Sequence, residues 1–316
     1  APEERELLSW IKNNPGRRLP GQRDTLSRLA GKGWVILEDQ PVKGTAGPLK
    51  KTCLRIRDDV DLEAILSGEK GRHGPRNERE FLELLRGSGT VPLSEITARF
   101  RNGLYLANKW TKAGALERRV ETFIRDPSGG IITTSPEPSI LFDQQANVLR
   151  HITGCLDKGT FSVCLLNGVT GSGKTEVYYR AARHVLSQGR QAIIMVPEIA
   201  LAMYMEGIFR SRFGDRVAVF HSGLSEGERY DQWMRMAGGK ADIVIGARSA
   251  LFSPLPRLGL IIVDEEYDWS YKQEEAPRYQ ARDSAVVRGR MENALVILGA
   301  GTPSVQSFQN ALSGRY

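Results

Sequence analysis

Cysteine is scarce in this sequence, and the few cysteines present are far apart. Cys53, Cys155 and Cys164 are the only three among 316 residues, and no CxxC pair occurs. This spacing predicts neither a disulfide framework nor a zinc site. The apolar surroundings of Cys155 and Cys164 indicate small core residues. Such cysteine usage fits a reducing, cytoplasmic setting.

Long apolar runs and targeting signals are missing as well. No apolar stretch approaches the ~18 residues that a membrane span requires. The first residues, APEERE, lack the pattern of a signal peptide. An apolar fraction of 41% and a charged fraction of 26% are typical of a soluble globular protein, so we expect no membrane partner. The absent initiating Met and the abrupt end at SGRY predict a piece of a longer protein.

Positive charge is concentrated in the first part of the chain. Residues 1–130 contain 24 Lys and Arg against 18 Asp and Glu, whereas residues 131–316 contain 20 against 19. An excess of positive charge in one region favours contact with nucleic-acid phosphates. A solvated basic surface without a partner fits this excess about equally well.

Two stretches rich in turn-forming residues divide the chain, and we predict linkers at 67–76 and 126–139. The segments before and between them, 1–66 and 77–125, resemble each other. Each contains two short amphipathic helical patterns, a glycine and a short β-like segment. This order predicts two small winged-helix-like α+β modules. Such modules serve either DNA contact or protein packing, and the sequence leaves both open.

The last block, 140–316, is different because short apolar runs alternate with helical patterns. The runs are continuous rather than alternating, which indicates strands buried on both faces and hence a parallel sheet between helices. The predicted strands lie within 161–168, 190–198, 216–222, 241–248, 258–266 and 294–302.

A glycine-rich loop follows the first of these strands. Residues 168–175 read GVTGSGKT, which fits the phosphate-binding pattern G-x-x-x-x-G-K-[ST] between a strand and a helix. We expect its backbone N–H groups to face phosphate oxygens, Lys174 to reach the β- and γ-phosphates, and the Thr175 hydroxyl to bind Mg²⁺. The predicted nucleotide-binding residues are Gly168, Val169, Thr170, Gly171, Ser172, Gly173, Lys174 and Thr175.

Carboxylates follow the strand LGLIIV at the same predicted edge of the sheet. We expect Asp264 to hold Mg²⁺ through water and Glu265 to orient or deprotonate the attacking water. An acidic pair after a strand is more often a solvated loop. The phosphate-binding loop in the same block favours catalysis, with Lys174, Asp264 and Glu265 as the catalytic residues.

Aromatic and basic residues are mixed in the next segment, DWSYKQEEAPRY. Base stacking on aromatic side chains is worth ~1–3 kcal/mol per base, and basic residues bind the backbone. We predict a sensor loop that links DNA occupancy to the position of Glu265. The alternative is that Trp269 and Tyr271 pack under the sheet. The DNA-contact candidates here are Trp269, Tyr271, Lys272, Arg278 and Tyr279.

Several segments together resemble one known family. They read GVTGSGKTEVYY, MVPEIAL, FHSGLSEGER, VIGARSALFSPL, IIVDEEYDWSYKQEEAPRYQARDSAVVRGR and LGAGTPS. They closely resemble the PriA family of superfamily-two replication-restart helicases, also called primosomal protein N′. The resemblance covers about 140–316 and is weaker over 77–125, where that family carries a winged helix. Residues 1–57 resemble nothing that we can name.

The resemblance implies an α/β fold, with a RecA-like P-loop NTPase lobe at 140–316 after the two small modules. It implies an ATP- and Mg²⁺-dependent 3′-to-5′ DNA helicase that acts at stalled or repaired replication forks to restart replication. The implied partners are branched or forked DNA, single-stranded DNA, single-stranded DNA-binding protein and other primosome proteins. A second lobe and a zinc module belong to a part of the family absent here, so we expect weak ATP or ADP binding and slow turnover.

The resemblance also assigns residues outside the glycine loop. It places Gln144 of FDQQA on the adenine edge, Arg248 and Ser249 of GARSALF against DNA phosphates, and Thr302 of GTPS in the coupling of hydrolysis to movement. Two positions in the coupling motifs depart from the family: Tyr267 stands where His is usual, and Ala300 where a hydroxyl residue is usual.

The hydroxyl residue usual in the family is also missing at Ala247. These departures predict intact ATP binding with weakened or altered coupling. They leave open a second function, a fork-binding scaffold with a vestigial nucleotide site. Another superfamily-two DNA translocase is a third possibility, which the segment SYKQEEAPRYQARD disfavours because generic motors lack it.

Overall fold

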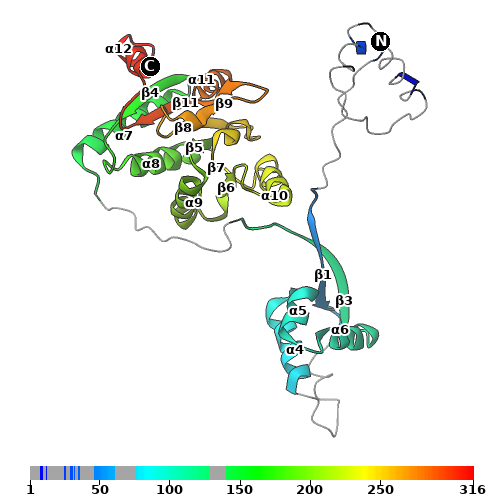
Figure 1. The fold of residues 1–316 in the computed structure, drawn as a ribbon. Coiled ribbons are helices and arrows are strands. Elements are labelled where there is room, and N and C mark those ends of the chain that lie inside the picture. Colours follow the sequence, from blue (N-terminus) through cyan, green and yellow to red (C-terminus); the bar gives the residue numbers. More distant parts are fainter. Residues whose placement is uncertain are drawn as a thin grey trace. The chain divides into compact units, whose positions relative to one another are not determined.

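The computed structural model describes residues 46–60, 76–127 and 140–316, together with a few single positions before residue 36. The helical patterns predicted before residue 46, and most of both predicted linkers, lie outside the described residues. The chain divides into two compact units, Ala1–Thr45 and Ala46–Tyr316. The fold below concerns the second unit (Figure 1).

The described residues between 49 and 123 form a small α+β module. Its antiparallel sheet has the strand order β2-β1-β3, and its core includes Leu54, Phe81 and Phe100. The rings of Phe81 and Phe100 meet edge to face with centroids 5.8 Å apart. The elements are β1 (Leu49–Ile56), α4 (Arg76–Ser88), β2 (Thr90–Pro92), α5 (Leu93–Arg99), α6 (Gly103–Lys112) and β3 (Leu116–Phe123).

Strand β1 changes the predicted module boundary. The sequence analysis placed it in the first module, 1–66, yet it pairs along its whole length with β3 and lies at the centre of the second module's sheet. Local patterns show that a segment is a strand but not which distant strand it pairs with. The small module therefore begins at or before Leu49 rather than at residue 77. Its assignment as a winged helix stays a prediction.

The lobe formed by residues 140–316 contains a parallel sheet of six strands. All six predicted strands are confirmed, and every neighbouring pair is parallel, in the order β4-β11-β8-β5-β7-β6. The strands are β4 (Ser162–Asn167), β5 (Gln191–Met195), β6 (Val217–Phe220), β7 (Ile243–Gly246), β8 (Leu258–Val263) and β11 (Leu295–Ala300).

Helices cover both faces of this sheet, as Figure 1 shows. Alternate strand residues point to opposite sides: Ile194 and Ile262 pack with α7, α8 and α9, whereas Ile193 and Ile261 pack in the cluster that contains α11 residues. Double burial explains the continuous apolar runs. The helices are α7 (Asp143–Lys158), α8 (Lys174–Ser187), α9 (Ile199–Phe213), α10 (Glu226–Ala237), α11 (Ala281–Glu292) and α12 (Val305–Leu312).

Short elements between the strands and helices complete the lobe. They are the 3₁₀ turns η1 (Gly214–Arg216), η2 (Arg248–Phe252) and η3 (Trp269–Tyr271) and the two-stranded ribbon β9 (Lys272–Gln273) and β10 (Tyr279–Gln280). None of the helices in the described part of the chain is long and apolar enough to cross a membrane.

Candidate functional site

The sequence motifs meet at one edge of the parallel sheet. Strands β4, β11 and β8 are neighbours, and each is followed by one motif: the glycine loop after β4, the carboxylates after β8 and Gly301 after β11. The carboxyl ends of parallel strands point the same way, which is where ligands of open α/β sheets bind. The predicted nucleotide site is therefore assembled from three adjacent strands.

The glycine loop has the backbone that its sequence requires. Gly171 and Gly173 both have φ of 81°, a left-handed conformation that glycine adopts without strain. A Cβ atom at Gly173 would lie only 2.2 Å from Gln145 Nε2. Helix α8 begins at the next residue, Lys174, and so directs its positive dipole end towards the loop. The Gly168 N–H donates to the carbonyl of Ala300 at 3.0 Å, which joins the loop to β11.

Lys174 already faces negative charge within the site. Its side chain is 11% exposed, its Nζ donates to the Gly168 carbonyl at 2.8 Å, and the Glu265 carboxylate lies 3.4 Å away. A largely buried ammonium group is costly unless a negatively charged or hydrogen-bonding partner lies beside it. A nucleotide phosphate carries charge of the same sign as this carboxylate.

Asp264 is held between two tyrosine hydroxyls. Tyr178 in α8 donates to its Oδ1 at 2.8 Å, and Tyr271 donates to its backbone carbonyl at 2.6 Å. Burial raises the pKa of the Asp264 carboxyl above its usual value, opposed by the bond from Tyr178. Thr175, in the first turn of α8, is half-buried near the same edge. Carboxylate and hydroxyl oxygens are the ligands that Mg²⁺ prefers, so this pair fits the ion.

Glu265 occupies a strained position that connects three segments. Its φ of 47° is unusual for a residue other than glycine. Its Oε1 faces Lys174, and its Oε2 accepts from the Gly301 N–H at 3.3 Å. Its carboxylate therefore touches both the glycine-loop helix and the end of β11. That position suits a group that handles a water molecule next to the γ-phosphate.

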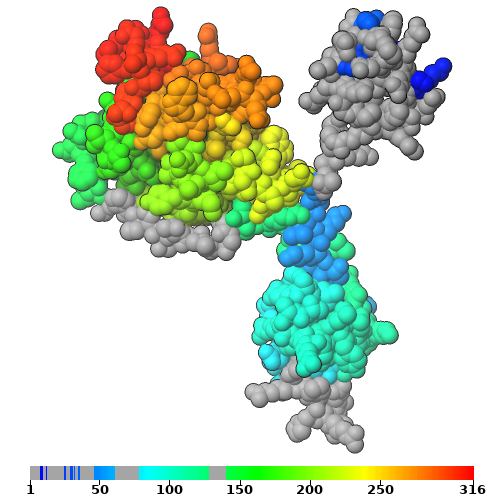
Figure 2. Space-filling model, in the orientation of Figure 1, coloured from blue at the N-terminus to red at the C-terminus, as the bar shows by residue number. Residues whose placement is uncertain are grey.

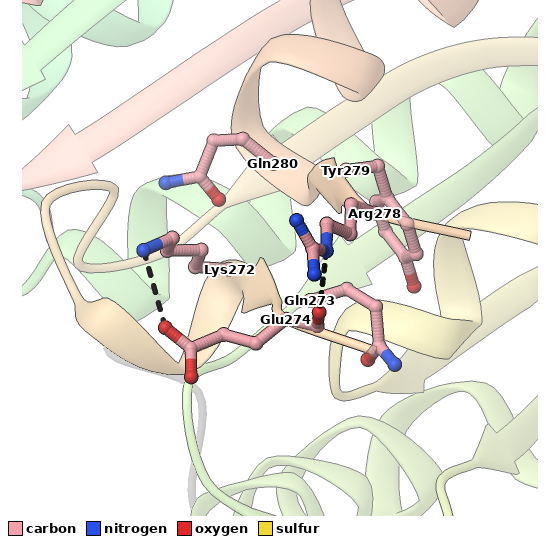
Figure 3. A pocket seen from close by; sticks show the side chains of 6 residues that line it. All are labelled: Lys272, Gln273, Glu274, Arg278, Tyr279 and Gln280. Carbon is pink, nitrogen blue, oxygen red and sulfur yellow. Dashed lines mark hydrogen bonds and ion pairs between the residues drawn. The ribbon is translucent and has the colours of Figure 1, made fainter. Parts of the chain in front are cut away.

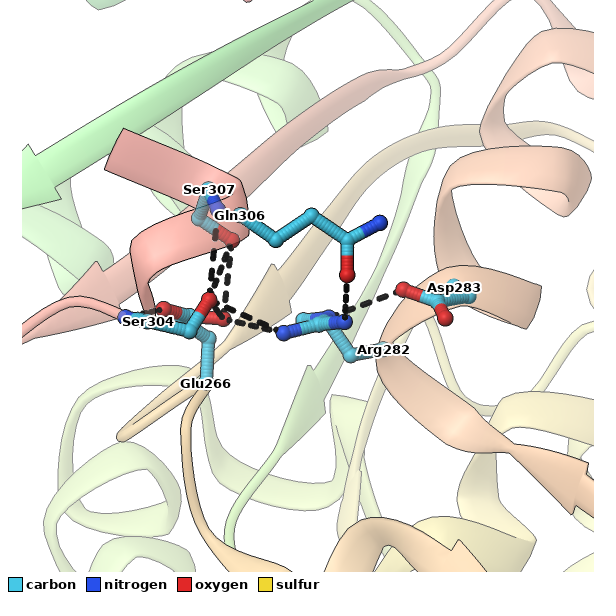
Figure 4. Close-up of polar contacts among 6 residues, drawn as sticks. All are labelled: Glu266, Arg282, Asp283, Ser304, Gln306 and Ser307. Carbon is cyan, nitrogen blue, oxygen red and sulfur yellow. Dashed lines mark hydrogen bonds and ion pairs between the residues drawn. The ribbon is translucent and has the colours of Figure 1, made fainter. Parts of the chain in front are cut away.

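The third carboxylate, Glu266, is the centre of a buried polar network (Figure 4). Its side chain is 0% exposed and forms an ion pair with Arg282 of α11 at 3.0 Å. Its Oε1 accepts from the Ser304 N–H at 2.6 Å, and its Oε2 accepts from the hydroxyls of Ser304 at 3.1 Å and Ser307 at 2.9 Å. Arg282 also donates to Gln306 at 3.1 Å. The network joins the end of β8 to α11 and to the start of α12.

The sequence analysis missed this network and also Tyr178. The partners of Glu266 are 16, 38 and 41 residues away, and no local spacing links them. The available signal was a third acidic residue directly after a buried strand, without an assigned role. Tyr178 did have a local signal: it lies one helical turn after Lys174 and so on the same face of α8.

In α7, Gln145 contacts the glycine loop, and it is the neighbour of Gln144, the residue predicted at the adenine edge. Gln145 Nε2 donates to the Ser172 carbonyl at 2.9 Å, while its Oε1 accepts from the Phe142 N–H at 3.1 Å. This second bond is a capping interaction at the start of α7, and it fixes the orientation of the Gln145 side-chain amide. Gln144 is exposed on the neighbouring helix position. The placement of Gln144 on the adenine edge stays a prediction.

Tyr271 does not offer a stacking surface for DNA. It is 1% exposed and packs in the core on the α11 side of the sheet, and burial raises its pKa well above the usual value. The alternative of packing under the sheet is therefore correct for Tyr271. Trp269, by contrast, is 79% exposed, and the Lys272 ammonium lies 5.6 Å from its ring centroid. The turn η3 places these two aromatic side chains on opposite sides.

The other predicted DNA-contact residues line the surface around the β9–β10 ribbon. Lys272, Arg278 and Tyr279 border a hollow of about 680 Å³, drawn in Figure 3. Figure 2 shows this part of the lobe, coloured orange, on its surface. The ring of Tyr279 meets that of Phe252 edge to face at 5.2 Å. Arg248 donates to the carbonyls of Lys272 at 2.7 Å and Ser270 at 3.2 Å, so it ties η2 to this segment.

The remaining predicted residues differ in exposure. Val169 is 72% exposed and Tyr267 47% exposed, whereas Ala300 is fully buried at the end of β11. Thr302 is exposed just beyond Ala300, and Ser249 is half-buried in η2. Among the coupling candidates, Ala300 accepts a hydrogen bond from the glycine loop, and it does so with its backbone carbonyl rather than its side chain.

Residues 142–308 match the family model of the DEAD/DEAH box helicases, which is more than half of the chain. The chain belongs to the DEAD/DEAH box helicase family. The matched residues include the glycine loop, all six strands of the parallel sheet and the carboxylates that follow β8.

Among curated proteins, this chain is similar to replication restart protein PriA. It is 41% identical to PriA of Bacillus subtilis (strain 168) over 226 residues, which cover 72% of this chain and 28% of the relative. It is 46% identical to PriA of Haemophilus influenzae over 295 residues, or 91% of this chain and 39% of the relative. The chain thus spans well under half the length of these relatives. A solved structure of RecG bound to a three-way DNA junction shares 26% identity over 56% of this chain and 23% of that chain, with a TM-score of 0.43.

Proposed function

We propose that this chain provides the ATP-binding lobe of a PriA-type DNA helicase that acts at stalled or repaired replication forks. In this proposal the motor moves 3′ to 5′ along single-stranded DNA, works in the cytoplasm and helps to load the primosome. Forked DNA, single-stranded DNA-binding protein and other primosome proteins are its proposed partners. The observation that carries the proposal is the meeting of Lys174, Asp264 and Glu265 at one sheet edge, beside an exposed aromatic and basic segment.

Within the nucleotide site, Lys174 would exchange one negative partner for another. Its ammonium now faces Glu265 at 3.4 Å, and a bound γ-phosphate would take over that role. The Glu265 carboxylate would then be free to orient or deprotonate the attacking water. Thr175 and Asp264 would hold Mg²⁺, which neutralises charge that develops on the phosphates.

On the DNA side, Tyr271 provides a direct connection to this site. Bases would stack on Trp269 and on Tyr279, with Lys272 and Arg278 near the backbone phosphates. Tyr271 lies in the same segment and donates to the Asp264 carbonyl at 2.6 Å. A shift of the segment on DNA binding would therefore act on the backbone of the Mg²⁺ ligand. This replaces the predicted direct link to Glu265 by one through Asp264.

The coupling of hydrolysis to movement is proposed to involve Tyr267, Ala300 and Thr302. Restoring the residues usual in the family, with Tyr267→His and Ala300→Ser in the full-length protein, is expected to raise DNA-stimulated ATPase rates. Ala300 is fully buried, so the added hydroxyl must find a hydrogen-bond partner to be tolerated. No gain with either variant would show that these positions do not weaken coupling.

Binding of a fluorescent ATP analogue with Mg²⁺ tests the proposed nucleotide site in this chain. Lys174→Ala is expected to weaken binding at least tenfold, because it removes a charge-assisted contact worth about 1.5–3 kcal/mol. Lys158→Ala, an exposed lysine at the end of α7, is the matched control and should bind like the wild type. Unchanged affinity in Lys174→Ala would refute the assignment of the loop.

A further inference from the structure

Three metal-ligating side chains lie together away from the nucleotide site. They are His151 and Cys155 of α7 and Cys164 of β4, and their ligand atoms are all within 4.8 Å of one another. The Cys155 Sγ is 3.8 Å from His151 Nε2. His151 and Cys155 are four residues apart and so share one face of the helix. The sequence analysis predicted small core residues and no zinc site, because Cys164 belongs to another element and local spacing does not show that it lies beside α7.

The spacing of these atoms is close to that of a tetrahedral thiolate site. With zinc–sulfur bonds of about 2.3 Å and zinc–nitrogen bonds of about 2.0–2.1 Å, neighbouring ligand atoms are roughly 3.5–3.8 Å apart. The observed 3.8 Å between Cys155 and His151 already fits, and the remaining distances need a closure of at most about 1 Å.

The His151 side chain leaves the cluster accessible to solvent. The two cysteines are half-buried and packed against the core, whereas His151 is exposed. Strand β4 is an edge strand of the sheet, so no further strand covers Cys164 on that side. An ion could therefore enter from the histidine side and keep a water molecule as its fourth ligand.

We propose that His151, Cys155 and Cys164 form a binding site for a thiophilic divalent metal ion of the zinc class. On binding, the S–H bond of each cysteine breaks, two metal–sulfur bonds form and two protons pass to water; no electrons are transferred. Burial, with Cys155 close by, raises the pKa of the Cys164 thiol to about 12, so the metal must displace a firmly held proton.

The position of this site would let a metal ion connect two parts of the nucleotide site. Helix α7 carries Gln145, which contacts the glycine loop, and β4 leads directly into that loop at Gly168. A metal bound to both elements would fix their separation. The metal proposal itself does not depend on the proposed helicase function, because its evidence is the cluster alone.

Titration of the reduced 316-residue chain with Co²⁺ alone tests the proposal. We expect one equivalent to produce the visible bands of tetrahedral cobalt and a thiolate-to-cobalt charge-transfer band, with release of about two protons. Zn²⁺ should then displace the cobalt and abolish the bands. Absence of the thiolate charge-transfer band in the wild-type chain would overturn the proposal.

Variants identify the ligands. Cys155→Ser and Cys164→Ser should lose the charge-transfer band or weaken Co²⁺ binding by more than the roughly 10–100-fold typical of outer-shell changes. Cys53→Ser is the matched control, because Cys53 lies in β1 of the small module and should leave the spectrum unchanged. His151→Ala changes an exposed residue, so it tests the site even if a half-buried cysteine variant fails to fold. A spectrum that survives His151→Ala, or disappears in Cys53→Ser, would contradict this ligand set.

Discussion

Replacing Arg282 with methionine removes the positive charge that faces the buried carboxylate of Glu266. The two side chains are 10% and 0% exposed, so water screens their interaction little. Removing one member of a buried ion pair typically costs about 3–5 kcal/mol, since the other charge stays buried. Glu266 would still accept hydrogen bonds from Ser304 and Ser307, which places the expected loss near the lower end, about 3 kcal/mol.

Thermal unfolding followed by circular dichroism measures this loss. In a domain of 150–250 residues each kcal/mol shifts Tm by about 2–4 °C, so Arg282→Met should lower the Tm of the lobe by roughly 6–12 °C. Arg290→Met is the matched control, because Arg290 is exposed on the same helix, and it should change stability by at most about 0.5 kcal/mol.

A double variant separates the ion pair from general disruption of the core. Glu266→Leu combined with Arg282→Met replaces both charges by apolar side chains, and it should be markedly less destabilised than the sum of the single variants. A strictly additive double variant, or an Arg282→Met protein as stable as the control, would refute the reasoning about the buried pair.

Three further outcomes are expected. Gly299→Ala should lower stability and weaken nucleotide binding, because a Cβ there would lie 1.8 Å from the Tyr178 hydroxyl; an unchanged Tm and affinity would contradict this. Asp264→Asn should abolish ATP hydrolysis yet raise the Tm of the nucleotide-free chain at neutral pH. The sign follows from the raised pKa of Asp264: a carboxyl with a raised folded pKa stabilises the fold when protonated, and that contribution is lost as pH rises through the folded pKa. The Tm difference should therefore shrink as the solution is acidified, and a constant difference would rule out burial of the charge as its cause. Trp269→Ala should weaken binding of single-stranded DNA by about 1–3 kcal/mol in a fluorescence titration, whereas an unaffected affinity would exclude stacking on this exposed ring.

The parts of the molecule that local spacing determines were predictable from the sequence. The glycine loop, the helix that begins at Lys174 and the six parallel strands depend on short-range patterns, and the structure has all of them where expected. Asp264 and Glu265 follow, because the end of a buried parallel strand fixes the edge at which they lie.

Two kinds of feature were not predictable: the direction in which a single side chain points, and the pairing of residues that are distant in the sequence. The contact of Gln145 with the glycine loop depends on helix phase, which the sequence motif alone does not give. Tyr271 and Trp269 are two residues apart in a charged segment, and the turn η3 buries one and exposes the other. Strand β1 and the partners of Glu266 are set by contacts across tens of residues, for which a single sequence contains no periodic signal.

The proposed communication between DNA and nucleotide through the Tyr271 hydroxyl is testable as a binding linkage. The affinity for a fluorescent ATP analogue with Mg²⁺ is determined with and without single-stranded DNA, for the wild type, for Tyr271→Phe and for Tyr105→Phe, which alters an exposed tyrosine in α6. DNA changes the affinity for nucleotide by the same factor as nucleotide changes the affinity for DNA. The ratio of the two analogue affinities, with and without DNA, therefore gives the coupling free energy. We expect a ratio different from one in the wild type and the control, and a ratio near one in Tyr271→Phe, which keeps the ring but loses the bond to Asp264. A Tyr271→Phe chain with the wild-type ratio, or a wild type without any coupling, would contradict a connection through this bond.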